Sequence, residues 1–177
     1  MKRVNNWLNS KIEPRKSKKE GSGEFAVDDI KKGEILAIFG GHIMTREERN
    51  NLPEDVRYLP IGIDEEMFIG PKSINETDDA DWFNHSCDAN AGLQGQIFLV
   101  AMKDIKKGEE ITFDYVMSCA QRGKKRILFK CNCGSKLCRK EITNLDWKIL
   151  GLQKRYKGYF SPYIQRNIDE LKNEKTK

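Results

Sequence analysis

The stretch "DWFNHSCDAN", residues 81–90, places His85 and Cys87 between two asparagines, Asn84 and Asn90, directly after an aromatic dipeptide. The chain has only two histidines, and one of them is here. Aromatic residues favour the core of a protein, whereas a run of polar side chains with a thiol does not. The segment is therefore either a tight turn or a functional site, and the rest of the sequence has to distinguish the two.

The composition indicates one soluble-type domain with appendages, because the chain has 177 residues. Hydrophobic residues make up 38% and charged residues 33%, so we expect a core beneath a densely charged surface. No uncharged apolar run is long enough to span a membrane, and the basic N-terminus lacks the apolar segment of a secretory signal. We therefore expect an intracellular protein, cytoplasmic or associated with the nucleus or nucleoid, without membrane contact.

The charges divide the chain into two basic ends and an acidic centre. Residues 1–20 carry 7 Lys and Arg against 2 Asp and Glu, and residues 120–177 carry 16 against 5. Residues 21–119 carry 9 against 20. Basic ends can contact nucleic acid and an acidic centre can attract a cationic substrate, although any single charge run is more often a solvated surface.

The cysteines predict a metal site rather than disulfides. Five cysteines without an export signal argue against a disulfide framework, and three of them crowd into "CNCGSKLC", residues 131–138. Zinc binds four soft or borderline ligands in a tetrahedron, and a Cys-x-Cys-x4-Cys loop supplies three of them. Three inert buried thiols are the alternative, which a Gly- and Lys-bearing loop disfavours. The spacing leaves four candidates for the fourth ligand: Cys87, Cys119, His42 and His85.

The hydrophobic patterns predict many short strands. Residues 24–44 read as a strand, a turn, a second strand and a Gly-Gly break, and residues 61–71 read as two strands around an acidic turn. Residues 92–105 read as another strand. The segment "VDDIKKGEIL" at 27–36 is echoed by "AMKDIKKGEEITF" at 101–113, which indicates two related hairpins rather than a repeat array.

Helices are expected at fewer places. Thr45 followed by Glu48 forms a capping box and predicts a short helix that ends before Pro53. Residues after 144 show helical spacing in two pieces, broken near Gly158–Pro162. Residues 1–20 read as a flexible or loosely docked arm. Together these patterns predict a mostly β, irregular α+β fold.

Two further segments are weak signals when each is taken alone. Gly21 and Gly23 in "EGSGEF" resemble a cofactor loop, but no helix follows, which excludes a dinucleotide fingerprint or a P-loop. Tyr115 follows the strand "GEEITFDY", where a tyrosine is most often a packed core residue.

Taken together, the segments resemble the SET-domain protein-lysine methyltransferases. The order is G-x-G-x-F-A at 21–26, "YLP" at 58–60, "FNHSCDAN", "GEEITFDY" and Cys-x-Cys-x4-Cys. The resemblance covers about residues 15–140. It implies short curled sheets with a knot-like core, a C-terminal zinc-binding post-SET segment and a helical tail. It divides the chain into a basic arm (1–14), a SET domain (15–118), a linker with the post-SET segment (119–143) and the helical tail (144–177).

The chain departs from the family pattern in two places. The family often has an arginine at the position of Asp81 or Trp82, and its absence leaves the polar contacts of that turn open. No cysteine precedes Cys87, so the cysteine-rich pre-SET segment of some members has no counterpart here.

The resemblance implies roles for particular residues. It implies that S-adenosylmethionine binds against Gly21, Ser22, Gly23, Phe25, Asn84, His85, Tyr115 and Leu137. It implies that one structural zinc is held by Cys87, Cys131, Cys133 and Cys138, and that Asn90 fixes the turn. Tyr115 would orient the lysine amine and the transferring methyl group, Tyr58 would line the lysine channel, and Phe113 occupies a position that acts in the family as a size and hydration switch.

The activity so implied is transfer of methyl groups to lysine in a basic protein, such as a histone-like or ribosomal protein. One alternative is a catalytically degenerate SET-type module that binds protein or nucleic acid, which the intact "NHSC" and Tyr115 disfavour. The other is a small zinc-dependent nucleic-acid protein, suggested by a pI of about 8.9 and the basic C-terminal residues. That alternative leaves Tyr115 unexplained.

Overall fold

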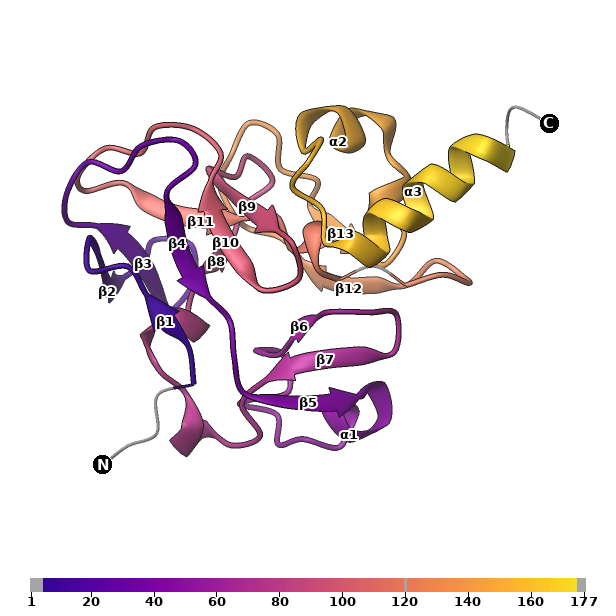
Figure 1. The fold of residues 1–177 in the computed structure, drawn as a ribbon, viewed down its shortest axis with the longest axis horizontal. Coiled ribbons are helices and arrows are strands. Elements are labelled where there is room, and N and C mark those ends of the chain that lie inside the picture. Colours follow the sequence, from indigo (N-terminus) through magenta and orange to yellow (C-terminus); the bar gives the residue numbers. More distant parts are fainter. Residues whose placement is uncertain (1–4, 120, 175–177) are drawn as a thin grey trace.

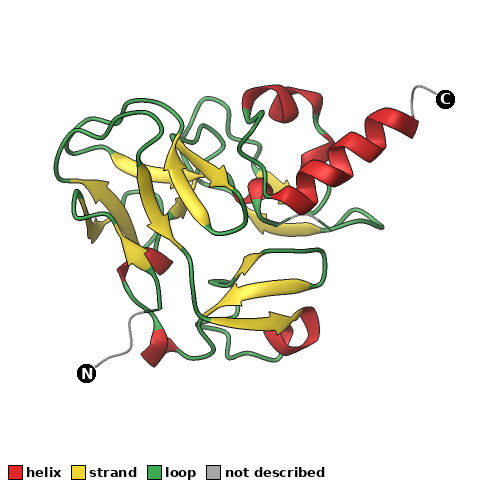
Figure 2. Ribbon diagram, in the orientation of Figure 1, coloured by secondary structure: helices red, strands yellow, loops and turns green. Residues whose placement is uncertain are grey.

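Short strands outnumber helices in the computed structural model, which describes residues 5–119 and 121–174 (Figure 2). Within those residues the main sheet runs in the order β1 (Trp7–Leu8), β4 (Ile35–Ile38), β10 (Phe98–Ala101), β9 (Ala91–Gln94), β11 (Glu110–Phe113), β3 (Ser22–Ala26) and β2 (Ile12–Lys16), with β8 (Asn84–His85) beside β11. A second sheet has the order β5 (His42–Thr45), β7 (Met67–Gly70) and β6 (Ile61–Gly62), and a third pairs β12 (Ile127–Lys130) with β13 (Glu141–Thr143).

The helices are short, apart from the last. The α-helices are α1 (Arg46–Asn50), α2 (Leu150–Arg155) and α3 (Pro162–Glu174). Single 3-10 turns are η1 (Ile74–Glu76), η2 (Asp79–Asp81), η3 (Tyr115–Met117) and η4 (Asp146–Lys148). Helix α1 begins at the expected capping box, in which Thr45 and Glu48 bond each other's backbone N–H, and it ends before Pro53 as expected. The mostly β fold class predicted from the sequence is confirmed.

Strand β11 lies at the centre of the molecule and pairs in parallel with two neighbours. Its Thr112 and Phe113 are in register with Asn84 and His85 of β8, and Phe113 is also in register with Ala91 of β9. Each parallel pair has the long crossover connection that such pairing needs, whereas β8 and β9 themselves are separated only by residues 86–90. Residues 86–90 must therefore bulge out between the two pairings, and this bulge belongs to the polar segment "DWFNHSCDAN".

Asn90 holds this bulge to β11 through both the NH2 group and the oxygen of its side-chain amide. Its amide donates to the Glu110 carbonyl at 2.9 Å, and its oxygen accepts from the Thr112 amide at 2.8 Å. The Asn90 backbone also donates to the Thr112 carbonyl at 3.2 Å. A buried amide with both functions satisfied stabilises a single register. This geometry agrees with the expectation that Asn90 fixes the turn.

The two echoed segments pack against each other rather than forming separate hairpins. Ile30 and Ile105 exchange backbone hydrogen bonds, each of 2.9 Å. In the flanking ion pairs, each segment supplies one lysine and one aspartate. Lys31 pairs with Asp104 at 2.9 Å, and Lys106 pairs with Asp29 at 2.7 Å. A near-symmetric clamp thus closes one end of the main sheet, and the sequence similarity reflects this shared contact.

Two expectations differ from the structure. Residues 92–105 contain two strands, β9 and β10, because Gly95 adopts φ +66° and turns the chain between them. The segment expected as a loosely docked arm supplies β1 and β2, which pair with β4 and β3. Apolar Trp7, Leu8 and Ile12 show no alternation with polar residues there, so a strand cannot be read from the sequence.

The C-terminal segment covers β9, as Figure 1 shows for α2 and α3 at the right of the main sheet. The Leu93 amide donates to the Tyr159 carbonyl at 3.1 Å, and a Cβ at Gly92 would lie 2.7 Å from the Tyr159 side chain. Buried Tyr156 donates its hydroxyl to the Cys87 carbonyl at 3.1 Å. The break expected near Gly158–Pro162 falls between α2 and α3. The helical tail is thus part of the core.

Glu24 of β3 is a buried carboxyl without a partner. Its side chain is 0% exposed, and neither carboxyl oxygen has a hydrogen-bond partner. Burial first, and then the nearby Asp79 carboxylate, raise the pKa of Glu24 to about 8. The folded protein therefore holds a proton on Glu24 at neutral pH.

This arrangement predicts a pH-dependent stability difference between wild type and Glu24→Gln. The folded-state pKa lies above the ordinary value of 4.5, so the unfolded chain releases this proton first as pH rises. Wild type should therefore lose stability relative to Glu24→Gln between pH 5 and pH 8, by a few kcal/mol. Denaturant unfolding of both proteins at the two pH values measures this difference, and an unchanged difference would contradict the assignment.

Candidate active site and metal centre

An aromatic pocket lies where β11 ends, between the main sheet and the second sheet. It has a volume of about 50 Å³. Its lining residues are Phe39, Tyr58, Leu59, Pro60, Ile61, Ala80, Asp81, Phe83, Phe113, Tyr115, Ser118 and Cys119. A narrow cavity walled mainly by rings and aliphatic groups admits an apolar stem and disfavours a charge.

Tyr115 presents its phenol on the pocket wall. The hydroxyl donates to the Phe83 carbonyl at 2.9 Å, and the ring centroid lies 4.9 Å from that of Phe113 and 5.7 Å from that of Phe129. Burial raises the pKa of Tyr115, with smaller contributions from Cys119 and Glu20, so the phenol stays protonated at physiological pH. Tyr115 is therefore held in one orientation as a neutral hydrogen-bonding group.

Tyr58 and Phe113 both line the pocket but differ in exposure. Phe113 is buried at the end of β11, whereas Tyr58 is 66% exposed and forms part of the mouth. Phe113 and Tyr115 both line the pocket, as expected for residues two positions apart at the end of a strand. Cys119 also lines the pocket, and burial raises the pKa of its thiol.

Asn84 ties the glycine-containing segment to β11. Its side-chain amide lies within hydrogen-bonding distance of the Glu20 carbonyl (3.1 Å), the Ser22 carbonyl (2.9 Å) and Glu110 Oε1 (3.0 Å). A Cβ at Gly23 would lie 2.7 Å from the Asn84 amide nitrogen, so a larger residue would displace this contact. Gly21 turns with φ +46°, and no atom within 4 Å would meet a Cβ there. The segment thus offers exposed backbone beside a rigid amide.

His85 is buried between the pocket and the cysteines. Its ring lies 5.2 Å from those of Tyr115 and Phe129, its Nδ1 accepts from the Tyr115 amide at 3.3 Å, and its Nε2 lies 3.3 Å from Cys87 Sγ. Burial lowers the pKa of His85 to about 4 despite the opposing effect of Asp114. The geometry favours a neutral ring that positions Tyr115 over one that transfers protons.

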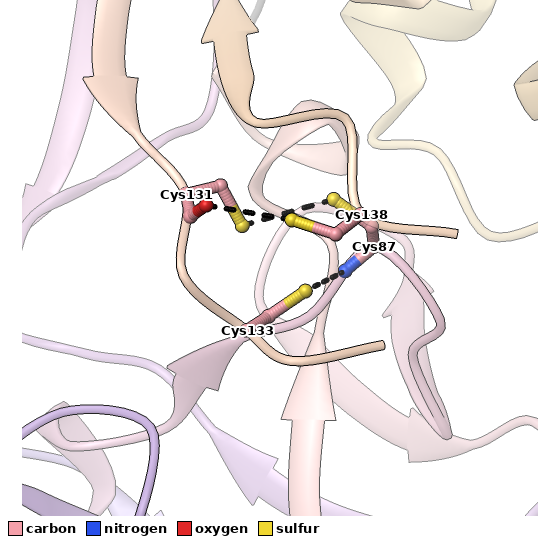
Figure 3. A group of neighbouring side chains, drawn as sticks. All are labelled: Cys87, Cys131, Cys133 and Cys138. Carbon is pink, nitrogen blue, oxygen red and sulfur yellow. Dashed lines mark hydrogen bonds between the residues drawn. The ribbon is translucent and has the colours of Figure 1, made fainter. Parts of the chain in front are cut away.

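Four cysteines converge on one point (Figure 3). The Sγ atoms of Cys87, Cys131, Cys133 and Cys138 all lie within 4.8 Å of one another, and those of Cys87 and Cys131 are 3.8 Å apart. Tetrahedral zinc with Zn–S bonds of about 2.3 Å separates its sulfur atoms by about 3.8 Å. The four residues therefore fit one zinc ion. Of the other candidates for a fourth ligand, Cys119 lies at the pocket and His42 pairs with Glu76 at 3.3 Å.

The surroundings of the cysteines favour negative sulfur at some positions. The Arg139 amide donates to Cys87 Sγ at 3.4 Å, and the Cys87 amide donates to Cys133 Sγ at 3.5 Å. Burial opposes ionisation of Cys133, but amides from Cys87 and Ser135 outweigh burial and lower its pKa. Burial raises the pKa of Cys87 to about 11, which a bound cation would reverse.

Arg139 connects the cysteine loop to the pocket through buried carboxylates. Its guanidinium binds Asp114 through two nitrogens at 2.5 and 2.8 Å and binds Asp146 at 2.9 Å. Asp114 immediately precedes Tyr115, so the loop and the phenol share one anchor. We did not predict this triad, because single charged residues in a chain with 33% charged residues give no signal of burial.

The remaining predicted residues lie around this centre with different exposure. Phe25 is half-buried, with the Arg15 guanidinium 6.0 Å from its ring centroid. Leu137 is 44% exposed on the cysteine loop. At the position where the family often has arginine, Asp81 accepts from the Asp78 amide at 2.9 Å and from the Asn6 side chain at 3.1 Å. The polar contacts of that turn thus come from the N-terminal segment.

A family model and individual known proteins were both found to be similar to this chain. The family model described as "SET domain" matches residues 21–116. The human histone-lysine N-methyltransferase, H3 lysine-36 specific, is 30% identical over 142 residues, which are 72% of this chain and 5% of that protein. Histone-lysine N-methyltransferase ASHH2 of Arabidopsis thaliana is 27% identical over 147 residues, covering 73% of this chain and 8% of that protein.

A solved structure, KRYPTONITE in complex with mCHG DNA and SAH, superimposes with a TM-score of 0.57 at 25% identity, covering 76% of this chain and 29% of that one. The chain thus spans less than a tenth of the two curated relatives named above. Among residues 5–119 and 121–174, no helix combines the length and apolar character that a membrane crossing requires.

The cysteine geometry predicts that Cys87→Ser loses zinc whereas Cys119→Ser retains it. Serine at position 87 removes one of four clustered sulfur atoms, while Cys119 lies outside the cluster. Metal analysis of the purified proteins should give about one zinc per chain for wild type and Cys119→Ser, and much less for Cys87→Ser. Zinc retained by Cys87→Ser but lost by Cys119→Ser would show that the fourth ligand is misassigned.

Proposed function

The chain belongs to the SET-domain family, and on that premise we propose that it is a protein-lysine N-methyltransferase that uses S-adenosylmethionine. Its acceptor is the side-chain amine of lysine in a basic protein, such as a histone-like or ribosomal protein. The observation that carries the proposal is a neutral Tyr115 hydroxyl, fixed on the Phe83 carbonyl, in the wall of a narrow aromatic pocket. A degenerate binding module has no use for such a fixed hydroxyl.

The cofactor is proposed to lie against residues 21–25, Asn84, His85 and Leu137. S-adenosylmethionine supplies a methyl group activated by a sulfonium centre. The residues present suit such a cation, because the Glu20 carboxylate acts on the Tyr115 phenol and the backbone around Gly21 is open to solvent. The amide of Asn84 holds the carbonyls of Glu20 and Ser22 in place before any ligand binds. Such preorganisation lowers the entropic cost of binding.

The pocket must receive lysine as a neutral amine, although its ordinary pKa is near 10.4. Rings of Phe39, Phe83 and Phe113 surround the position of the amine and disfavour an ammonium ion. Tyr115 cannot accept the proton, because burial raises its pKa and keeps it neutral. The lysine proton therefore leaves to water, while the Tyr115 oxygen orients the amine lone pair toward the methyl group.

The acidic centre of the chain supports a cationic protein substrate. Residues 21–119 carry 20 acidic against 9 basic residues, and they include every strand that lines the pocket. Incubating the protein with cell lysate and methyl-labelled cofactor, followed by mass spectrometry of lysine-containing peptides, tests the activity and identifies the substrate. Absence of labelled lysine in every fraction would contradict the proposal.

Tyr115→Phe should reduce methyl transfer at least about 100-fold while leaving the fold and zinc content unchanged. The substitution removes one hydroxyl from an alignment-dependent site and keeps the ring that packs on Phe113 and His85. Tyr159→Phe removes a hydroxyl outside the pocket and serves as the control. Single-turnover rates with saturating peptide measure the effect, and near wild-type turnover by Tyr115→Phe would identify a structural tyrosine.

Phe113 should set the number of methyl groups transferred. The residue is a buried part of the pocket lining, so a phenylalanine leaves room that a tyrosine hydroxyl and its bound water would fill. We expect wild type to proceed beyond monomethyl-lysine and Phe113→Tyr to stop earlier. Product masses after long incubation report the distribution. Monomethyl product from both proteins would indicate that another residue, such as Tyr58 or Phe129, limits the pocket.

A further inference from the structure

Five arginines lie close to the aromatic pocket or line a second pocket beside α1. Helix α1 carries Arg46 and Arg49, and Arg57 lies in the loop that follows it. Arg122 and Arg126 lie in the segment just before β12. Arg46, Arg122 and Arg126 line a second pocket of about 250 Å³ together with Glu65, Glu66 and Gln121. We name these five residues the arginine cluster.

Two members of the cluster are stacked on aromatic rings rather than paired with acids. The Arg49 guanidinium lies 5.6 Å from the Tyr58 ring centroid and 5.2 Å from that of Phe68. The Arg57 guanidinium lies 5.6 Å from the centroid of the same Tyr58 ring. The Nε atoms of both arginines are buried without a hydrogen-bond partner. Ring faces hold these cations in place, and because the Nε atoms are buried, the terminal nitrogens of the guanidinium groups are the donors that can meet an acceptor from solvent.

The acids near the cluster do not neutralise it. Arg46 pairs with Glu66 at 2.9 Å, and Arg122 pairs with Glu65 and Glu170. Within residues 5–119 and 121–174, the ion pairs include no carboxylate for Arg49, Arg57 or Arg126. Arg49 bonds the side chain of Asn50 at 3.5 Å, and Arg126 bonds that of Gln121. Three positive charges thus remain uncompensated.

Two of the uncompensated charges, Arg49 and Arg57, lie beside the pocket entrance. Tyr58, on which Arg49 and Arg57 stack, is the exposed rim of the pocket. Arg49 and Arg46 both act electrostatically on Cys119, which lines the same pocket. A chain whose lysine enters the pocket must therefore pass these guanidinium groups within a few residues of that lysine.

We propose that the arginine cluster binds a carboxylate side chain of the substrate, so that the target lysine is flanked by an aspartate or glutamate. This inference rests on the proposed function and narrows its substrate class. A basic protein satisfies it when one acidic residue lies close to the modified lysine. Guanidinium groups with free N–H donors bind carboxylates through charge-assisted hydrogen bonds.

A nucleic-acid backbone fits the cluster less well than an acidic side chain. Phosphate backbones bind extended basic surfaces, whereas here Glu65, Glu66 and Glu170 pair with arginines of the cluster and repel a polyanion. A single carboxylate needs only Arg49 and Arg57, neither of which pairs with those acids. The mixed charge of the cluster therefore favours one localised anion.

Matched peptides test the proposal. Each short fluorescent peptide has one central lysine and either glutamate or glutamine at a single test position. The test position runs from four residues before the lysine to four residues after it. Anisotropy gives the dissociation constant, and methylation gives KM and kcat. At one or two positions glutamate should strengthen binding and lower KM about fivefold, with kcat little changed. This preference should weaken as salt is raised.

The variants Arg49→Gln and Arg57→Gln should remove the preference for glutamate. Arg49→Lys should retain part of it, because the charge remains while the planar donors are lost. Lys103→Gln removes an exposed basic residue away from the pocket and should leave the preference intact. Thermal unfolding of each variant identifies any that fails to fold, and the remaining arginine variant then provides the comparison.

The outcomes separate this inference from the proposed function. Equal affinity for glutamate and glutamine peptides at every position overturns the arginine-cluster assignment even if methylation proceeds. Selective binding of glutamate peptides without methylation supports the anion site and contradicts the proposed activity. Binding of a single-stranded oligonucleotide that Arg49→Gln abolishes, without any peptide preference, would assign the cluster to nucleic acid and overturn the proposal.

Discussion

The parallel pairing of strand β11 with both β8 and β9 is the constraint on which the rest of the structure depends. Because Phe113 faces His85 on one side and Ala91 on the other, the five residues between those strands must leave the sheet. That bulge carries Cys87 to the cysteine loop, and Asn90 closes it onto Glu110 and Thr112. The same strand delivers Phe113 and then Tyr115 to the pocket. The metal centre, the glycine-containing segment and the pocket therefore share one support, and a register shift in β11 would displace all three.

Burial, more than charge pairing, sets the chemistry around this strand. It keeps Tyr115 protonated and His85 neutral, and it places Arg139 between Asp114 and Asp146 as the charged link to the cysteine loop. A neutral centre suits the proposed reaction, in which an uncharged amine would enter beside a cationic cofactor. Arg49 and Arg57 of the arginine cluster instead place positive charge on Tyr58 at the rim. The interior of the site thus suits the proposed alignment of the reacting groups, and its rim suits the proposed recognition of a substrate carboxylate.

Much of the site could be predicted from local patterns. The Cys-x-Cys-x4-Cys spacing, the "NHSC" segment and the "FDY" end of β11 each have a fixed local geometry, so their order along the chain indicates the fold that joins them. The capping box at Thr45 and the break near Gly158 are likewise local. The strand at Trp7–Leu8 and the turn at Gly95 were missed, because a two-residue strand has no periodicity and an isolated glycine has several explanations. The strand depends on pairing with distant β4, and the turn depends on the φ that Gly95 adopts within the β9–β10 hairpin.

By itself, the sequence determined the fold class, the resemblance to SET-domain methyltransferases and the residues of the metal and pocket motifs, because these depend on short spacings within one segment. The tertiary structure decided which of the candidate ligands joins the cysteine loop, since Cys87 lies 44 residues from Cys131 and only their packing brings the sulfur atoms to 3.8 Å. It also decided that Glu24 is buried without a partner and that Arg49 and Arg57 stack on Tyr58. Exposure and partnership of charged side chains arise from contacts between distant segments, so no local pattern encodes them.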